Sequence, residues 1–157
     1  MVDGRILGDP GAPGFQVERY PFYLLNRTVS RYNTLIDAAL KGIGLDIPYW
    51  RVLMILGEAS PRGVGQIAEA AVINLSTMTR IIQRMEAAGL VSGRPSADDA
   101  RVTEVGLTAE GERKAEAARA ITAPFYADVI KGFSARDFDQ LTRLLNRLHD
   151  NLSAIGR

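Results

Sequence analysis

The chain has 157 residues, of which 46% are apolar and 24% are charged, and its net charge is +1. This length and composition predict a folded globular chain rather than a disordered one. Cysteine is absent and His149 is the only histidine, which excludes disulfides, thiolate nucleophiles and cysteine zinc sites and argues against a Ser-His-Asp triad. We therefore expect no metal, no cofactor and no catalytic residue.

The overall charge does not by itself indicate a nucleic-acid partner, because cations and anions nearly balance. All but three of the 19 basic residues are arginine, which suits bidentate contacts with phosphate or carboxylate groups, although genome base composition explains the bias equally well. No segment approaches the ~20 apolar residues of a membrane span. The N-terminus also lacks a signal-peptide pattern, so we expect a cytoplasmic protein without a membrane partner.

The first segment, residues 1–19, is rich in glycine and proline, which predicts neither helix nor strand. It is interpreted either as a flexible tail or as an arm lying on a partner subunit. From Phe22 to Ile43, apolar residues recur at alternating steps of three and four, which predicts an amphipathic helix. Pro48 then suits the first turn of a second helix that reaches Glu58.

In the middle of the chain, the spacing of the apolar residues changes from a helical pattern to a strand pattern. Two short helices are expected at about 64–71 and 74–88, after a loop at 60–63. Between Leu90 and Leu107 the apolar residues alternate as in strands, which predicts a hairpin with a long polar tip.

The C-terminal third is again helical in pattern. We expect Thr108 to cap a helix that Pro124 kinks or divides into a new segment. Apolar residues from Phe138 to Ile155 also step by three and four. Pairing the two terminal apolar stripes with those of a second copy would bury them, which predicts a homodimer; a monomeric helical bundle is the alternative.

The segment from Gln66 to Ile82 has the pattern of a helix-turn-helix. Ala68 is small where the two helices would approach, and Asn74 is placed to cap the second helix. Away from its apolar face, the second helix carries side chains suited to phosphates and to base edges in a major groove. These side chains are Ser76, Thr79, Arg80 and Gln83. A solvated helix of an ordinary bundle would show the same pattern.

The hairpin that follows carries Arg94 and Arg101. Arginine is favoured in a narrow minor groove, which a hairpin beside a recognition helix can reach. We expect Asp99 to orient Arg101 by a charge-assisted hydrogen bond. A solvated charged turn is the alternative interpretation.

Between Tyr23 and Gly111 the chain resembles the MarR family of transcriptional regulators, on the motifs PYWRVLMIL, QIAEAA, NLSTMTRIIQRMEAAGLV, DDAR and VGLTAEG. The resemblance implies a mainly α fold with a small β-hairpin wing, namely a winged helix-turn-helix with N- and C-terminal dimerisation helices. It implies a homodimer on double-stranded DNA with a pseudo-palindromic operator. Its DNA-contacting roles carry over to Ser76, Thr77, Thr79, Arg80, Arg94, Asp99 and Arg101.

The corresponding domain organisation has three parts. An N-terminal arm covers 1–19, the dimerisation region covers 20–46 and 112–157, and the DNA-binding domain covers 47–111. Two residues depart from the family's pattern. Val72 replaces the usual glycine of the turn and resists a positive φ, so we expect a reshaped turn. Ala100 replaces a second wing arginine, which predicts weaker minor-groove affinity or a narrower set of operators.

The resemblance also implies an effector that binds between the dimerisation helices and the DNA-binding lobe and releases DNA. An aromatic wall with arginines suits a small aromatic carboxylate or an acyl-thioester. The candidate ligand-binding residues are Tyr32, Trp50, Arg51 and Arg31, with Arg27 nearby. The two aromatic residues are alternatively plain core residues.

The function favoured by these patterns is a sequence-specific DNA-binding regulator, acting as a repressor that the ligand releases. The alternative is a dimeric small-molecule-binding module of the same fold without specific DNA binding, which only Val72 and Ala100 support. An enzyme is disfavoured because the sequence shows no metal cluster, phosphate-binding glycine loop or activated nucleophile.

Overall fold

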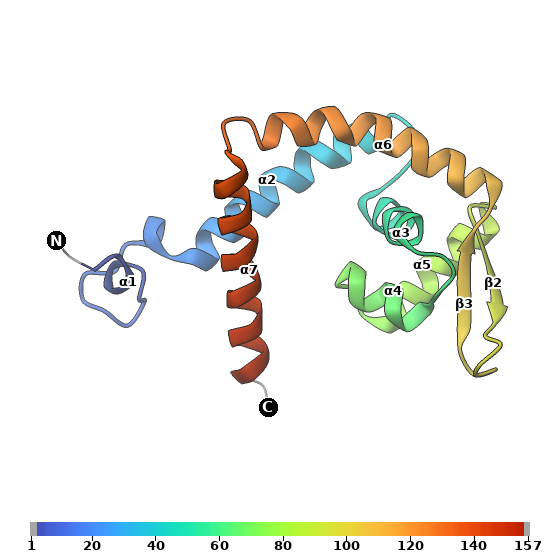
Figure 1. The fold of residues 1–157 in the computed structure, drawn as a ribbon, viewed down its shortest axis with the longest axis horizontal. Coiled ribbons are helices and arrows are strands. Elements are labelled where there is room, and N and C mark those ends of the chain that lie inside the picture. Colours follow the sequence, from blue (N-terminus) through green and yellow to red (C-terminus); the bar gives the residue numbers. More distant parts are fainter. Residues whose placement is uncertain (1–2, 156–157) are drawn as a thin grey trace. The chain divides into compact units, whose positions relative to one another are not determined.

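The computed structural model describes residues 3–155, which form two compact units that divide between Thr122 and Ala123. The fold is mainly helical with one small antiparallel sheet, as predicted (Figure 1). The helices are α1 (Gly4–Leu7), α2 (Pro21–Lys41), α3 (Ile47–Glu58), α4 (Val64–Ala71), α5 (Leu75–Ala87), α6 (Ala109–Val129) and α7 (Ala135–Ile155), with a 3₁₀ turn at Val17–Arg19. The strands are β1 (Arg62–Gly63), β2 (Val91–Pro95) and β3 (Thr103–Leu107).

The N-terminal arm contains helical structure, so the prediction of neither helix nor strand for 1–19 is wrong for its described part. The Asp3 carboxylate accepts a hydrogen bond from the Arg5 backbone N–H at 2.9 Å and so caps α1. Farther along, the Gln16 N–H donates to the Leu7 carbonyl oxygen at 2.8 Å and folds the arm back on itself. These local bonds offset the entropy that the glycines lose on ordering. Residues 1 and 2 lie outside the described range.

The first two long helices begin and end close to the predicted residues. Pro21 stands in the first turn of α2, and the Asp46 carboxylate caps α3 by accepting a hydrogen bond from the Tyr49 N–H at 2.8 Å. In α2 only Ile36 and Leu40 are buried. By contrast α3 buries Trp50, Val52, Leu53 and Leu56, so the central helices contribute most of the core.

The sheet has the strand order β1-β3-β2, and both pairs are antiparallel. The predicted hairpin is confirmed as β2 and β3, with Gly93 opposite Val105. A third strand, β1, lies at Arg62–Gly63, where the sequence predicts only a loop. Two residues are too few to show a period, and this strand exists only because β3 offers it an open edge.

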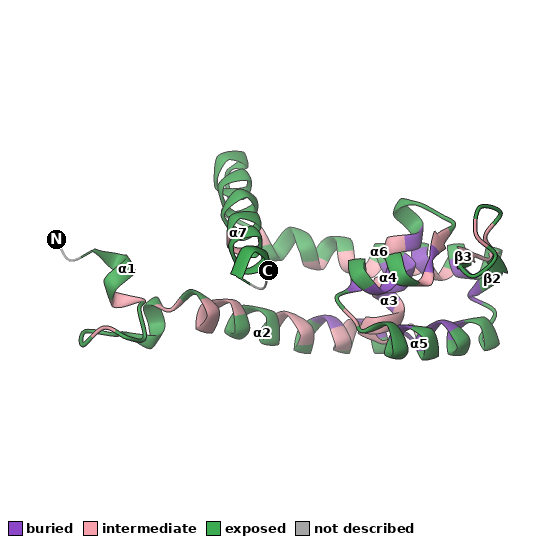
Figure 2. Cartoon of the chain, turned by 90° about the horizontal axis from the view of Figure 1, so that it is seen from below, coloured by how far each residue is buried: buried purple, intermediate pink, exposed green. Residues whose placement is uncertain are grey.

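The buried core of the described residues lies between Ile36 and Ala118 and is entirely apolar (Figure 2). Its largest fully buried side chains include Leu53, Ile67 and Met78. In the second unit, α7 buries no residue. None of the described helices is both long and apolar enough to cross a membrane.

The start of α6 is fixed by Thr108, as predicted. Its hydroxyl accepts a hydrogen bond from the Gly111 N–H at 3.0 Å and donates to the Gly89 carbonyl at 2.6 Å. Farther along, α6 continues through Pro124 to Val129, so no new helix begins at that proline. A proline removes one backbone hydrogen bond, and the helical turns on both sides carry α6 through this position.

Candidate nucleic-acid interface

The second helix of the helix-turn-helix, α5, has one buried face and one exposed face. Met78, Ile81, Ile82 and Met85 are buried. All five side chains predicted to contact DNA on this helix are exposed, namely Ser76, Thr77, Thr79, Arg80 and Gln83. The packing of α5 therefore leaves its polar face accessible to a partner.

The N-terminus of α5 is capped as predicted. The Asn74 side-chain oxygen accepts hydrogen bonds from the Thr77 N–H at 2.8 Å and from the Ser76 hydroxyl at 2.9 Å. One turn later, the Thr79 hydroxyl donates to the Leu75 carbonyl at 2.9 Å. A helix N-terminus carries a partial positive charge and favours an anion such as a phosphate. These hydrogen bonds hold the hydroxyls in place in the first turns of α5, at the end that favours an anion.

The turn between α4 and α5 keeps its left-handed residue, which corrects the expectation of a reshaped turn. Val72 has φ 55° and ψ 47°, a conformation that costs an L-residue roughly 1–2 kcal/mol. The next residue, Ile73, donates its N–H to the Ala68 carbonyl at 3.0 Å and closes the end of α4. Ala68 is buried at the helix crossing, as predicted. Packing on both sides of the turn therefore holds Val72 in this conformation.

The wing tip presents an arginine that a carboxylate orients. The Arg101 Nε lies 3.1 Å from the Asp99 Oδ1, and the Arg101 backbone N–H donates to the same oxygen at 3.0 Å. These bonds, with the side-chain bond the stronger cause, lower the pKa of Asp99. The Arg101 side chain remains 91% exposed. The predicted pairing of Asp99 with Arg101 is confirmed, and it leaves the guanidinium turned largely to solvent.

A second wing carboxylate, Glu104, was missed by sequence reasoning. It stands opposite Arg94 in the hairpin register, and its Oε2 lies 3.7 Å from the Arg94 Nε. Its other oxygen accepts a hydrogen bond from the Ser96 hydroxyl at 3.0 Å. Only the cross-strand register brings Glu104 opposite Arg94. That register could be predicted from the sequence only if the position of the turn were already known.

Helix α5 also contacts α3 and β2 through polar side chains. The Arg84 guanidinium lies 5.8 Å above the ring of Tyr49, a cation–π distance. The Glu86 Oε1 accepts a hydrogen bond from the Gly93 N–H at 2.7 Å. Sequence reasoning predicted neither contact, because both depend on how α5 is oriented against neighbouring elements.

Three of the candidate effector residues lie near one another in the first unit. The rings of Tyr32 and Trp50 are 6.4 Å apart, and Trp50 is only 7% exposed. Burial raises the pKa of the Tyr32 hydroxyl, while the charge of Arg51 acts in the opposite direction. The Arg51 Nη1 donates to the Ala71 carbonyl at 3.3 Å. Thus Arg51 joins the aromatic pair to the end of α4.

The other two arginines, Arg31 and Arg27, both lie on α2. Arg31 is exposed on α2, and the Arg27 guanidinium lies 5.5 Å over the ring of Tyr23. The core alternative for Trp50 fits its burial, whereas Tyr32 is only partly buried.

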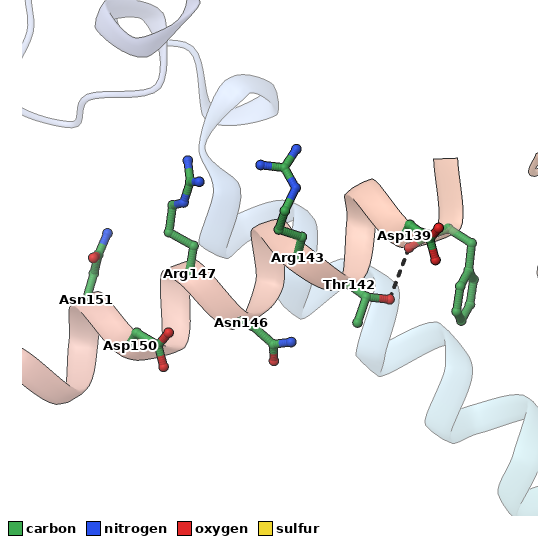
Figure 3. Close-up of a pocket in the computed structure, with 8 residues that line it drawn as sticks. Asp139, Thr142, Arg143, Asn146, Arg147, Asp150 and Asn151 are labelled. Carbon is green, nitrogen blue, oxygen red and sulfur yellow. Dashed lines mark hydrogen bonds between the residues drawn. The ribbon is translucent and has the colours of Figure 1, made fainter. Parts of the chain in front are cut away.

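A hollow of about 640 Å³ lies along α7 (Figure 3). Its lining residues all come from one helix, and all but the first are polar or charged: Phe138, Asp139, Thr142, Arg143, Asn146, Arg147, Asp150 and Asn151. Charges of both signs and an open lining do not provide the apolar enclosure that an aromatic ligand needs. Among the described residues, no three His, Asp or Glu side chains lie close enough to bind a metal.

Comparisons with known proteins agree with this geometry. The MarR family model matches residues 45–103. The chain is 37% identical over 147 residues to the HTH-type transcriptional repressor IacR of Pseudomonas putida, which covers 94% of this chain and 88% of that protein.

Solved structures show the same fold. A MarR family transcriptional regulator from Silicibacter pomeroyi is 25% identical, with a TM-score of 0.80 over 92% of this chain and 97% of that one. A mutant of E. coli MarR complexed with operator DNA is 21% identical, with a TM-score of 0.71 over 83% of this chain and 95% of that one. The winged helix-turn-helix fold predicted from the sequence is thereby confirmed.

Proposed function

The chain belongs to the MarR family of transcriptional regulators, and we propose that it is a homodimeric repressor that binds a pseudo-palindromic operator. The observation that carries the proposal is the exposed polar face of α5 beside an oriented wing arginine, Arg101. The similarity to a protein named as a transcriptional repressor supports repression rather than activation.

Each candidate residue has a role that suits its position. The hydroxyls of Ser76 and Thr77 at the N-terminus of α5 suit phosphate contacts, with Thr79 beside them. Arg80 and Gln83, farther along the same exposed face, suit guanine and adenine edges in the major groove. Arg101 suits the minor groove, where narrow segments attract arginine.

The domain organisation proposed for this function follows the sequence. Residues 47–111 bind DNA, 20–46 and 112–157 form the dimer, and 1–19 form an arm. A dimer presents two recognition helices, which must match half-sites about 34 Å apart. We also propose that the protein acts in the cytoplasm, as its family of DNA-binding regulators suggests, and we assign it no catalytic activity.

The effector site proposed here consists of Tyr32, Trp50 and Arg51, with Arg31 as a further candidate. An aromatic pair beside an arginine suits a small aromatic carboxylate or an acyl-thioester. Such a ligand releases DNA only if it binds more tightly to a dimer whose recognition helices no longer match the half-site spacing. The bond from Arg51 to Ala71 connects this group to the helix-turn-helix.

The test is a titration of fragments from the gene's own promoter with the wild type and single variants. Arg80→Ala is expected to weaken specific binding by about 10- to 100-fold and to relax the sequence preference. Arg101→Ala should weaken binding and reduce its salt dependence. Arg113→Ala serves as a matched control, because Arg113 is exposed on α6 and paired with Glu110. If no fragment is bound above bulk DNA, the proposal fails.

A further inference from the structure

The outer edge of the wing is joined to the recognition helix at one backbone group. In the order β1-β3-β2, β2 is an edge strand whose only partner in the described sheet is β3. The N–H of Gly93 does not contribute to that pairing, because it donates to the Glu86 Oε1 at 2.7 Å. A side chain of α5 therefore takes the place that a further strand would occupy at this residue.

Glu86 stands on the same stripe of α5 as the proposed DNA-reading residues. Thr79, Gln83 and Glu86 follow one another at steps of four and three, and all are exposed. Residues at these steps lie one above another on a helix. The stripe that faces DNA in the proposed function thus ends, one turn later, in the residue that bonds to the wing.

We propose that Glu86 is a positioning residue that sets the direction of the wing relative to the recognition helix; this inference rests on the proposed DNA binding. The base of β2 is fixed where Val91 is buried in the core. The bond from Gly93 to Glu86 fixes a second point two residues nearer the tip. The hairpin is also held by the pairing of β2 with β3, whose Val105 is buried. The bond to Glu86 adds a direct restraint of the outer strand against α5, and so of the position at which the wing presents Arg101.

The contact with Glu86 also requires glycine at position 93. A Cβ there would lie 2.6 Å from the Glu86 Oε1 and 3.2 Å from the Thr103 Cγ2. Any larger residue must push the carboxylate away from the backbone N–H. The contact can therefore be broken from either side, by shortening Glu86 or by adding a methyl group to Gly93.

The DNA-binding test uses the full chain and its promoter fragment. Glu86→Ala and Gly93→Ala should each weaken binding about fivefold, the ratio expected for one exposed hydrogen bond. The double variant should be no weaker than either single one, and Glu86→Ala should have no further effect in the Arg101→Ala background. Glu86→Gln removes the same charge but keeps an acceptor oxygen, so it should rescue most of the loss.

A second measurement needs no DNA. In the free wild type, ¹⁵N relaxation should show ordered amides at 96–102, and Glu86→Ala should lower their order parameters while those of α5 stay unchanged. Glu86→Gln should preserve them. The inference is overturned if Glu86→Ala leaves the wing amides as ordered as in the wild type, or if its effect on binding adds fully to that of Arg101→Ala. A failure of every variant and the wild type to bind DNA, with the relaxation result intact, would instead overturn the proposed function.

Discussion

The central module, residues 47–111, and the last helix, α7, bury their apolar residues to different extents. Between residues 47 and 111, the apolar side chains form a core in which Leu53, Ile67 and Met78 are almost fully buried. In α7, a helix of 21 residues, none is buried. The module therefore carries its own stabilising contacts, whereas the stability of α7 depends on a surface supplied from elsewhere.

The apolar residues of α7 form one stripe. Those that are most exposed are Phe138, Leu141, Leu144, Leu145, Leu152 and Ile155. Exposed stripes of this length are typical of interaction surfaces rather than of free monomers. We expect the second copy of a homodimer to be the surface that covers them.

Of the proposed substitutions, a charge in this stripe should have the largest effect on dimer formation and on DNA affinity. Leu145→Asp places a carboxylate where we expect the dimer to bury a leucine, which costs several kcal/mol when no partner is present. We expect a monomer by sedimentation and a loss of operator affinity of at least about 100-fold, because the second half-site is no longer linked. Asn146→Asp, on the polar side of α7 (Figure 3), should remain dimeric. A dimeric Leu145→Asp would show that the stripe is not the interface.

A substitution that creates a cavity in the core of the module should lower the stability of the fold and leave dimer formation unaffected. Met78 is 0% exposed, and replacing it with alanine should lower the free energy of unfolding by about 3 kcal/mol. Met54→Ala is the matched control because Met54 is 45% exposed. Urea denaturation measures both variants. Equal losses at the two positions would contradict the location of the core.

A substitution in the turn of the helix-turn-helix should instead raise the stability of the protein. Val72 has φ 55° and is 87% exposed, so Val72→Gly removes strain without removing packing. We expect stabilisation of about 1 kcal/mol in urea denaturation. Val72→Ala keeps the Cβ atom and should stabilise much less. A destabilised glycine variant would show that the backbone at this turn is not left-handed.

The smallest predicted effect is local to the wing. Hydrogen bonds from Arg101 hold the pKa of Asp99 below its ordinary value of 3.8. A lowered pKa means that the interaction is fully present above the ordinary value and is lost as the pH falls through the lowered one. A carboxyl NMR titration should therefore give a midpoint below 3.8 for Asp99 and a return toward that value in Arg101→Ala. An unchanged midpoint in the variant would exclude this pairing in solution.

The features predicted correctly from the sequence are those that depend on local pattern. The cap at Asn74, the buried face of α5 and the pairing of Asp99 with Arg101 each involve residues a few positions apart. Errors arose where distant contacts override local preference. Val72 accepts a left-handed backbone because its neighbours are packed, and β1 forms only against β3.

The prediction for the arm is wrong for a different reason. Its glycines and prolines disfavour helix, but the hydrogen bonds that the Arg5 N–H donates to Asp3 and the Gln16 N–H donates to Leu7 order it locally. Likewise, the contact of Glu86 with Gly93 joins residues seven positions apart across a helix end, and no periodicity reveals it. The DNA-contacting and effector roles assigned to individual residues remain predictions.

The measurement that tests the central claim most directly is the number of chains on one DNA site. Native mass spectrometry of the protein with the shortest promoter duplex that retains full affinity should give two chains per duplex and no stable complex with one. A single chain bound to that duplex with undiminished affinity would contradict the account, because one recognition helix and one wing would then suffice.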